Sequence, residues 1–235
     1  MNDDFYIGYL PRTSPGLARF VRRRVLLLLC LGALVPLLLV STMSGFSRAS
    51  FEFGVEREFE GTLRGGAVPL LLVDRPGGGG TSSYLLSAFG KFGAAHELDG
   101  LEGSRVRLRG TLVHRDDRTM IEVAADSVER SGPGATSPAD IHHGEVTLEG
   151  EIVDSKCYLG VMKPGNLKPH RACAVRCISG GIPPVLLVRD EEGRATYHLL
   201  VDPEGRAVNR RVLHLVAEPV RATGLHVDPE RIERL

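Results

Sequence analysis

The hydrophobic pattern begins with one long uncharged run, from Val25 to Met43, which holds 19 residues. At about 1.5 Å per residue, a helix of that length nearly crosses the roughly 30 Å hydrocarbon core of a bilayer. Five arginines precede the run and only Arg48 follows it within ten residues, so the positive-inside rule predicts a cytoplasmic N-terminus. We therefore expect a cytoplasmic leader at residues 1–24, a single transmembrane helix at 25–43, and the remaining chain outside the cytoplasm. A cleaved signal peptide is the alternative, which the long leader disfavours.

Beyond residue 50, the apolar positions come in short runs of β-branched and aliphatic residues that Gly, Pro and Asp interrupt. Such runs favour strands, and no long stretch has the helical period. Comparison of the chain with itself adds that the strand pattern occurs twice. Three segments match later segments in the same order: 59–63 with 148–152, 69–73 with 184–188, and 121–130 with 225–234.

Each copy contains about five short strands, and five strands in this order suit a small closed barrel. We therefore predict a mainly β protein with two tandem OB-like five-stranded barrels, at residues 51–130 and 144–235, joined by a linker at 131–143. The resemblance to the OB-fold rests on the spacing of the strands and not on a signature motif. A pair of small β-sandwiches is the alternative.

Composition and charge argue against nucleic acid as a partner. The chain carries 29 basic and 29 acidic residues and no Trp. Five Arg and two Asp in the first 43 residues leave a net charge of −3 on the rest. OB-folds that bind nucleic acid use basic grooves and aromatic side chains that stack on the bases. The part of the chain expected outside the cytoplasm has a net negative charge and no Trp. The expected partners are the membrane and a membrane protein.

One segment of the second copy has no counterpart in the first. The offset between the matches grows from 89 to 115, so the second copy holds 26 extra residues between its first two strands. This segment, Asp154 to Pro184, contains every cysteine outside the apolar run. The loop between strands 1 and 2 flanks the usual ligand face of an OB barrel. We expect it to protrude and to contain a short helix between Pro169 and Gly180.

The inserted segment carries the candidate chemistry. At 100° per residue, His170, Cys173 and Cys177 fall on one narrow face of the helix, and Cys157 lies upstream. Three thiols and one imidazole make a complete tetrahedral set, so these four residues are candidate ligands of zinc, copper or iron, with Met162 as a soft fifth donor for copper. In an oxidising compartment, a disulfide from Cys157 to Cys173 or Cys177 is the alternative. A thiol–disulfide redox role is a third interpretation.

The remaining histidines are assigned no role. His142 and His143 adjoin each other just before the second barrel, where they could reach a metal, but adjacent histidines in a linker are usually solvated. The others, among them His198 and His226, are isolated on strand-like or loop segments.

The segment from Val153 to Pro183 also contains a specific pattern, Val-Asp-x-x-Cys-x-x-Gly followed by His-x-x-Cys-Ala-x-x-Cys-Ile-x-x-Gly-x-Pro. This pattern resembles that of uncharacterised exported bacterial proteins with a small OB-like β domain. The resemblance covers some 30 residues and implies export and a shared site, not a particular reaction. The first barrel and the leader lie outside it.

No nucleophile with a base, no paired carboxylates and no cofactor fingerprint is present, so the sequence disfavours an enzyme. It favours a membrane-anchored accessory or binding protein in a redox or metal-handling complex of the cytoplasmic (inner) membrane, with a single pass. A thiol–disulfide oxidoreductase and a purely structural, disulfide-stapled interaction module are the alternatives.

Overall fold

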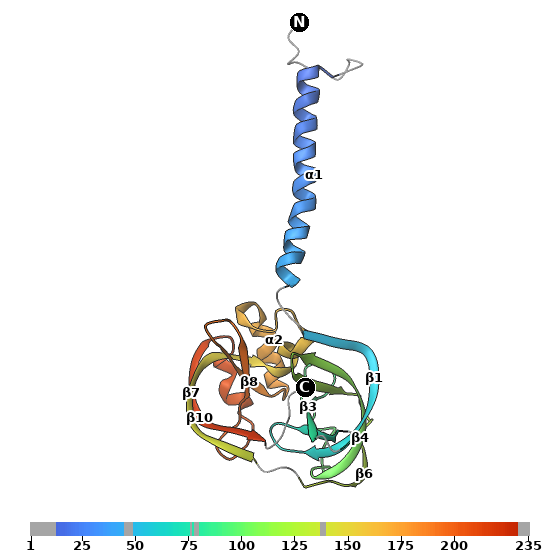
Figure 1. The fold of residues 1–235 in the computed structure, drawn as a ribbon, viewed down its shortest axis with the longest axis vertical. Coiled ribbons are helices and arrows are strands. Elements are labelled where there is room, and N and C mark those ends of the chain that lie inside the picture. The colour runs from blue at the N-terminus through green and yellow to red at the C-terminus, as the bar shows by residue number, and fades with distance from the viewer. Residues whose placement is uncertain (1–12, 45–48, 76, 78–79, 137–139, 230–235) are drawn as a thin grey trace. The chain divides into compact units, whose positions relative to one another are not determined.

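Figure 1 shows the computed structural model, which describes residues 13–44, 49–75, 77, 80–136 and 140–229. The chain divides into two units, Met1–Phe46 and Ser47–Leu235.

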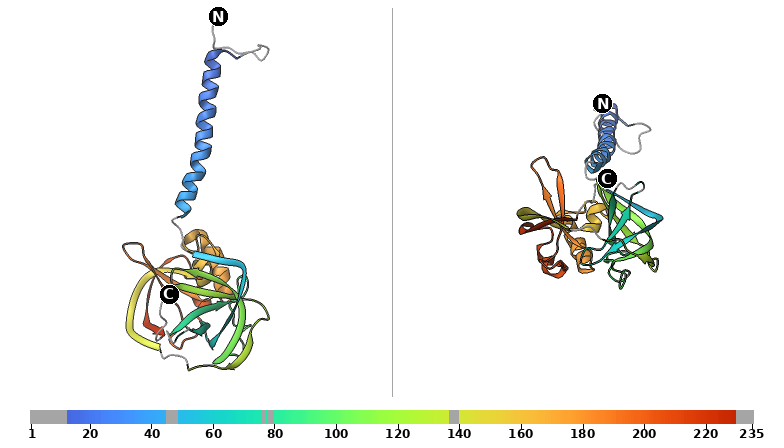
Figure 2. Two further views of the ribbon diagram at one scale, coloured as in Figure 1. Left: turned by 45° about the vertical axis from the view of Figure 1, so that its right-hand side comes forward. Right: turned by 60° about the horizontal axis from the view of Figure 1, so that its bottom comes forward.

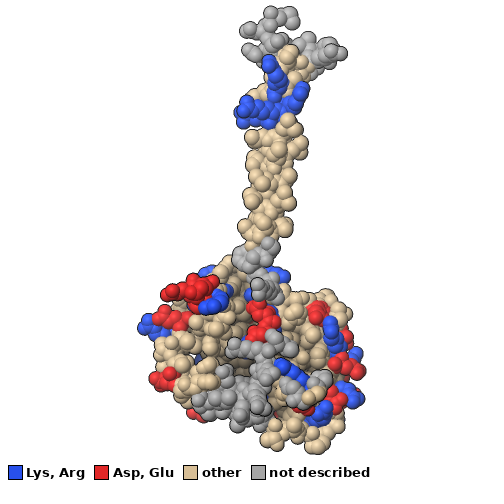
Figure 3. Space-filling model, viewed as in Figure 1, with Lys and Arg blue, Asp and Glu red and all other residues tan. Residues whose placement is uncertain are grey.

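The first unit contains one helix, α1 (Pro15–Ser44). Its segment Pro15–Thr42 has a mean hydropathy of 2.6 and is long and apolar enough to cross a membrane, as predicted. The helix begins ten residues before the predicted span, so residues 15–24 of the expected leader are helical. Basic side chains gather at the N-terminal end of α1 (Figure 3), and the last turn carries none.

The second unit begins with six strands. They are β1 (Ala49–Arg64), β2 (Leu70–Asp74), β3 (Thr81–Ser87), β4 (Ser104–Arg115), β5 (Arg118–Val123) and β6 (Glu129–Pro133). They form sheet A in the order β1-β2-β3-β5-β4-β6, and β4 also pairs with β1. Strands β1 to β5 therefore close into a barrel, which confirms a closed five-stranded first barrel. Its core is formed by alternate apolar residues of these strands, among them Leu63, Leu71, Leu86, Val106, Leu108 and Ile121.

Sheet B follows and is open. Its strands are β7 (Asp140–Asp154), β8 (Pro184–Arg189), β9 (Ala195–Leu199) and β10 (Pro219–Pro229), in the order β10-β7-β8-β9. Among the described residues no fifth strand bridges β9 and β10 as β5 bridges β3 and β4, so the predicted second closed barrel is not found. The third sequence match was misleading, because Ile121 lies on β5 whereas Leu225 lies on β10. Residues 131–133 and 140–143, assigned to the linker, lie in β6 and β7.

The first two sequence matches do occupy equivalent places. Gly61 on β1 and Gly150 on β7 each face the neighbouring strand so closely that a Cβ would lie 2.4 Å from a carbonyl oxygen, that of Leu72 or of Leu187. Each glycine is required there, because any side chain would collide with the adjacent backbone. The repeat as a whole stays a prediction.

The inserted segment between β7 and β8 contains two helical elements, the π-helical turn η2 (Cys157–Val161) and α2 (Leu167–Ser179). Figure 2 shows this segment between the two sheets. Leu159 packs against the barrel residues Val113 and Met120, and Ile178 packs into the core of sheet B. The expectation of a protruding loop was wrong, because these apolar side chains are buried between the sheets. Two short helices, α3 (Asn209–Val212) and η3 (Leu213–Leu215), precede β10.

Candidate metal centre

The end of α2 is set by two glycines. The N–H of Ile182 donates to the carbonyl of Cys177, and the N–H of Gly181 donates to that of Ile178. These two bonds form a Schellman motif, which satisfies carbonyls that a helix leaves without partners. Gly181 has a φ of 100°, which glycine adopts without strain. The motif fixes the last turn of α2 and hence the position of Cys177.

The same glycines bring α2 against the first barrel. The N–H of Gly93, in the loop after β3, donates to the carbonyl of Gly180 at 3.0 Å. A Cβ on Gly180 would lie 2.0 Å from the carbonyl oxygen of Lys91, and one on Gly93 would lie 2.3 Å from that of Gly181. Only glycines permit such a close approach of the two backbones. This approach places Lys91 next to the cysteines.

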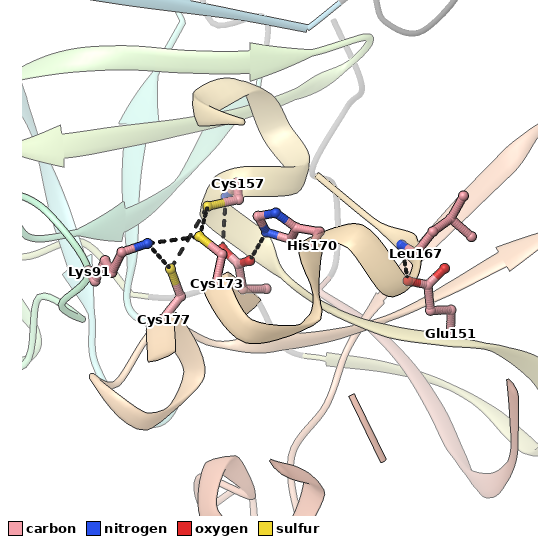
Figure 4. Close-up of polar contacts among 8 residues, drawn as sticks. Lys91, Glu151, Cys157, Leu167, His170, Cys173 and Cys177 are labelled. Carbon is pink, nitrogen blue, oxygen red and sulfur yellow. Dashed lines mark hydrogen bonds and ion pairs between the residues drawn. The ribbon is translucent and has the colours of Figure 1, made fainter. Parts of the chain in front are cut away.

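Three sulfurs converge where η2 meets α2 (Figure 4). The Sγ of Cys157 lies 3.9 Å from that of Cys173 and 3.8 Å from that of Cys177, and all three lie within 4.8 Å of one another. Cys157 and Cys177 are buried, and Cys173 is half-buried. A tetrahedral ion with metal–sulfur bonds of about 2.3 Å holds its sulfurs roughly 4 Å apart, so the spacing suits a shared ion.

The three cysteines are free thiols in this structure, as is Cys30 on α1. Neither predicted disulfide partner of Cys157 lies at the bonding distance of about 2.05 Å.

His170 lies beside this cluster but not within the group of three sulfurs. Its Nε2 lies 2.9 Å from Oδ2 of Asp154, and both residues are buried. Oδ1 of Asp154 accepts a hydrogen bond of 2.8 Å from the N–H of Cys157. Asp154, Cys157 and His170 form a second group with ligand atoms within 4.8 Å. The four predicted ligands thus lie together as two groups that share Cys157.

Met162 follows η2 and is 43% exposed. Its backbone N–H donates to the carbonyl of Cys157 at 3.3 Å. That its thioether binds copper as a fifth donor stays a prediction.

No protein-family model, curated protein or solved structure matches this chain. Its function therefore has to be argued from the site.

Two lysines form contacts between the inserted segment and the first barrel. The Nζ of Lys91 donates to Sγ of Cys173 at 2.8 Å and lies 3.8 Å from Sγ of Cys177. Lys156 is fully buried next to Cys157 and pairs with Glu122 of the barrel. Sequence reasoning missed both, since Lys91 is 82 residues from Cys173 and its surroundings contain no ligand motif.

The surroundings of Cys157 and Cys177 shift the pKa of these two thiols. The hydrogen bond to Cys177, together with burial, raises the pKa of Cys157, and the same bond lowers the pKa of Cys177. Lys91 lowers the pKa of Cys177 further, and the hydrogen bond with Cys173 raises the pKa of Lys91. The arrangement therefore favours a thiolate at Cys177, and the thiolate is the form of cysteine that binds metals and attacks disulfides.

Proposed function

We propose that this chain is a membrane-anchored, extracytoplasmic accessory or binding protein that holds a metal ion on Cys157, Cys173 and Cys177. The observation that carries the proposal is the convergence of three free sulfurs at metal-sharing distance. Sulfur-rich sites select zinc, copper(I) or iron–sulfur centres over magnesium and calcium. Three thiolates and a divalent cation leave one negative charge, which the Lys91 ammonium balances.

His170 is the candidate fourth ligand. Asp154 engages its Nε2, as carboxylates commonly hold metal-binding imidazoles, and this leaves Nδ1 as the donor atom. Because His170 is outside the three-sulfur group, the alternative is a three-cysteine site whose fourth position is filled by water or by a partner. An open position of that kind suits a protein that passes a metal to another one.

The same proposal includes the cellular setting. Helix α1 anchors the chain in the cytoplasmic membrane with its arginine-rich end inside, and the β unit acts outside, in a redox or metal-handling complex with a membrane protein. The strand order β1-β2-β3-β5-β4-β1, with β3 parallel to β5, supports an OB-like barrel. Sheet B repeats four of these strands in the same order, which supports a second, incomplete copy.

The test is metal analysis of the full chain, purified in detergent without reductant, together with a count of reactive thiols. We expect about one thiolate-bound ion per chain, which Cys157→Ser, Cys173→Ser or Cys177→Ser removes. Cys30→Ser is the matched control, because Cys30 lies on α1, and it should keep the ion. His170→Ala should weaken binding by a large factor if the imidazole is a ligand, and little if the site holds sulfur ligands only. Equal metal content in all four cysteine variants would refute the proposal.

Thiol–disulfide exchange is a second candidate, favoured by one observation. Lys91 donates to the half-buried Cys173, and Cys157 lies 3.9 Å away as a resolving thiol. Attack by the Cys173 thiolate on a substrate disulfide would release one substrate thiolate, and Cys157 would then displace the other and close an internal disulfide. Turnover of a model disulfide with a dithiol reductant, abolished by Cys173→Ser, would favour this function. Metal binding without turnover would reject it.

A further inference from the structure

Three histidines on different strands come together in sheet B. His143 lies on β7, His198 on β9 and His226 on β10. The ring centroid of His226 lies 5.0 Å from that of His143 and 5.4 Å from that of His198. Strands β9 and β10 are the two edges of the open sheet, so these rings connect edges that do not pair through their backbones.

The spacing of the two ring pairs that include His226 suits a shared ion. On a tetrahedral metal with metal–nitrogen bonds of about 2.0–2.1 Å, two imidazole centroids lie roughly 5 Å apart. Three histidines with one open position are also a known ligand set for zinc. The Nε2 of His198 lies 3.3 Å from Oγ1 of Thr196, a hydroxyl that can orient that ring.

The nitrogens are gathered less tightly than the sulfurs of the first centre, so binding requires the rings to rotate. The exposure of His143 and the partial exposure of His198 and His226 leave room for this rotation. Imidazole ligands suit zinc, copper(II) and nickel, whereas the thiolate site favours softer ions.

We propose that His143, His198 and His226 form a second metal site, for a borderline divalent cation such as Zn²⁺, that bridges β9 and β10 across the open side of sheet B. The site does not depend on the thiolate centre, because the two share no residue. Bound metal stabilises the folded β unit, since the ion holds two sheet edges together and does not bind the unfolded chain in this geometry.

The experiment titrates Co²⁺ into the full chain, purified in detergent through a tag without histidine. Thiolate ligands give Co²⁺ intense charge-transfer absorption in the near ultraviolet, whereas imidazole ligands give only weaker visible bands, so the two sites are measured separately. We expect one nitrogen-only site per chain in the wild type. It should persist in the Cys157→Ser/Cys173→Ser/Cys177→Ser variant, and if that variant fails to fold, the wild-type spectra still decide.

His226→Ala is expected to weaken the nitrogen-only site at least about tenfold and to leave the thiolate absorption unchanged. The matched control is His96→Ala, which removes an exposed histidine of the first barrel and should change neither signal. Two results overturn the proposal. One is the absence of a nitrogen-only site in the wild type, and the other is a site that His96→Ala weakens as much as His226→Ala, which would mean adventitious binding only.

Discussion

Replacing Lys156 by methionine tests what holds the inserted segment against the first barrel. Lys156 is 1% exposed, and its Nζ donates to the carbonyls of Ala88 at 2.7 Å and Gly90 at 2.8 Å. It also forms an ion pair with Glu122 on β5, which is 9% exposed. Methionine has nearly the same length but removes the charge and all three interactions.

The expected cost follows from what the substitution leaves behind. A buried carboxylate without its partner, as Glu122 would become, costs about 3–5 kcal/mol. For a unit of this size, each 1 kcal/mol lowers the melting temperature by about 2–4 °C, so Lys156→Met should lower it by about 6–20 °C. The double variant Lys156→Met/Glu122→Leu should recover part of the loss, because it removes the stranded charge and leaves only two carbonyls without a donor.

Scanning calorimetry of the full chain in detergent measures the effect. Lys168→Met is the matched control, because it removes an exposed ion pair with Glu218 and should change the melting temperature little. If Lys156→Met shifts the melting temperature no more than Lys168→Met does, the ion pair between Lys156 and Glu122 does not hold the inserted segment against the first barrel. If Lys156→Met/Glu122→Leu is less stable than either single variant, the loss of stability does not come from leaving the Glu122 carboxylate buried without a partner.

Two further predictions concern the fold and the membrane helix. Gly150→Ala should cost about 1–3 kcal/mol in urea unfolding because its Cβ would meet the Leu187 carbonyl, whereas Gly224→Ala on β10 has open space and should cost less; equal costs would contradict the argument. A reporter fused after Leu235 should be active outside the cytoplasm because the arginines precede the apolar run, and an active cytoplasmic reporter would reverse the proposed topology.

The features that sequence predicted correctly depend on local spacing. The four-residue step from Cys173 to Cys177 places both sulfurs on one side of a helix, and Gly180 with Gly181 marks where that helix ends. The apolar run defines α1 for a similar reason, because length and the absence of charge suffice. The proximity of Cys157 also follows, since the connection that contains it starts and ends on adjacent strands, β7 and β8.

The features that sequence did not predict depend on distant contacts. Lys91 reaches the sulfurs only because Gly93 and Gly180 allow two backbones to touch, and nothing near Lys91 in sequence indicates this. The second barrel was overestimated because alternating apolar residues look alike on any strand, so a segment of β10 was matched to β5. His198 and His226 appear isolated in the sequence. The curvature of sheet B brings their strands together, and the sequence does not indicate this curvature.

The role of Lys91 separates the two proposed functions. Hydrogen bonds to charged groups contribute about 1.5–3 kcal/mol, and because Lys91 is exposed, screening reduces this toward about 1.4 kcal/mol, or tenfold in affinity. In a metal site, Lys91→Met should therefore weaken binding about tenfold in a chelator competition, with the stoichiometry unchanged, and Lys91→Arg should retain most of it. In an oxidoreductase, the same substitution should instead slow alkylation of Cys173, because the hydrogen bond that Lys91 donates to its sulfur is lost. Unchanged affinity together with an unchanged alkylation rate would show that the 2.8 Å contact between Lys91 and Cys173 contributes to neither function.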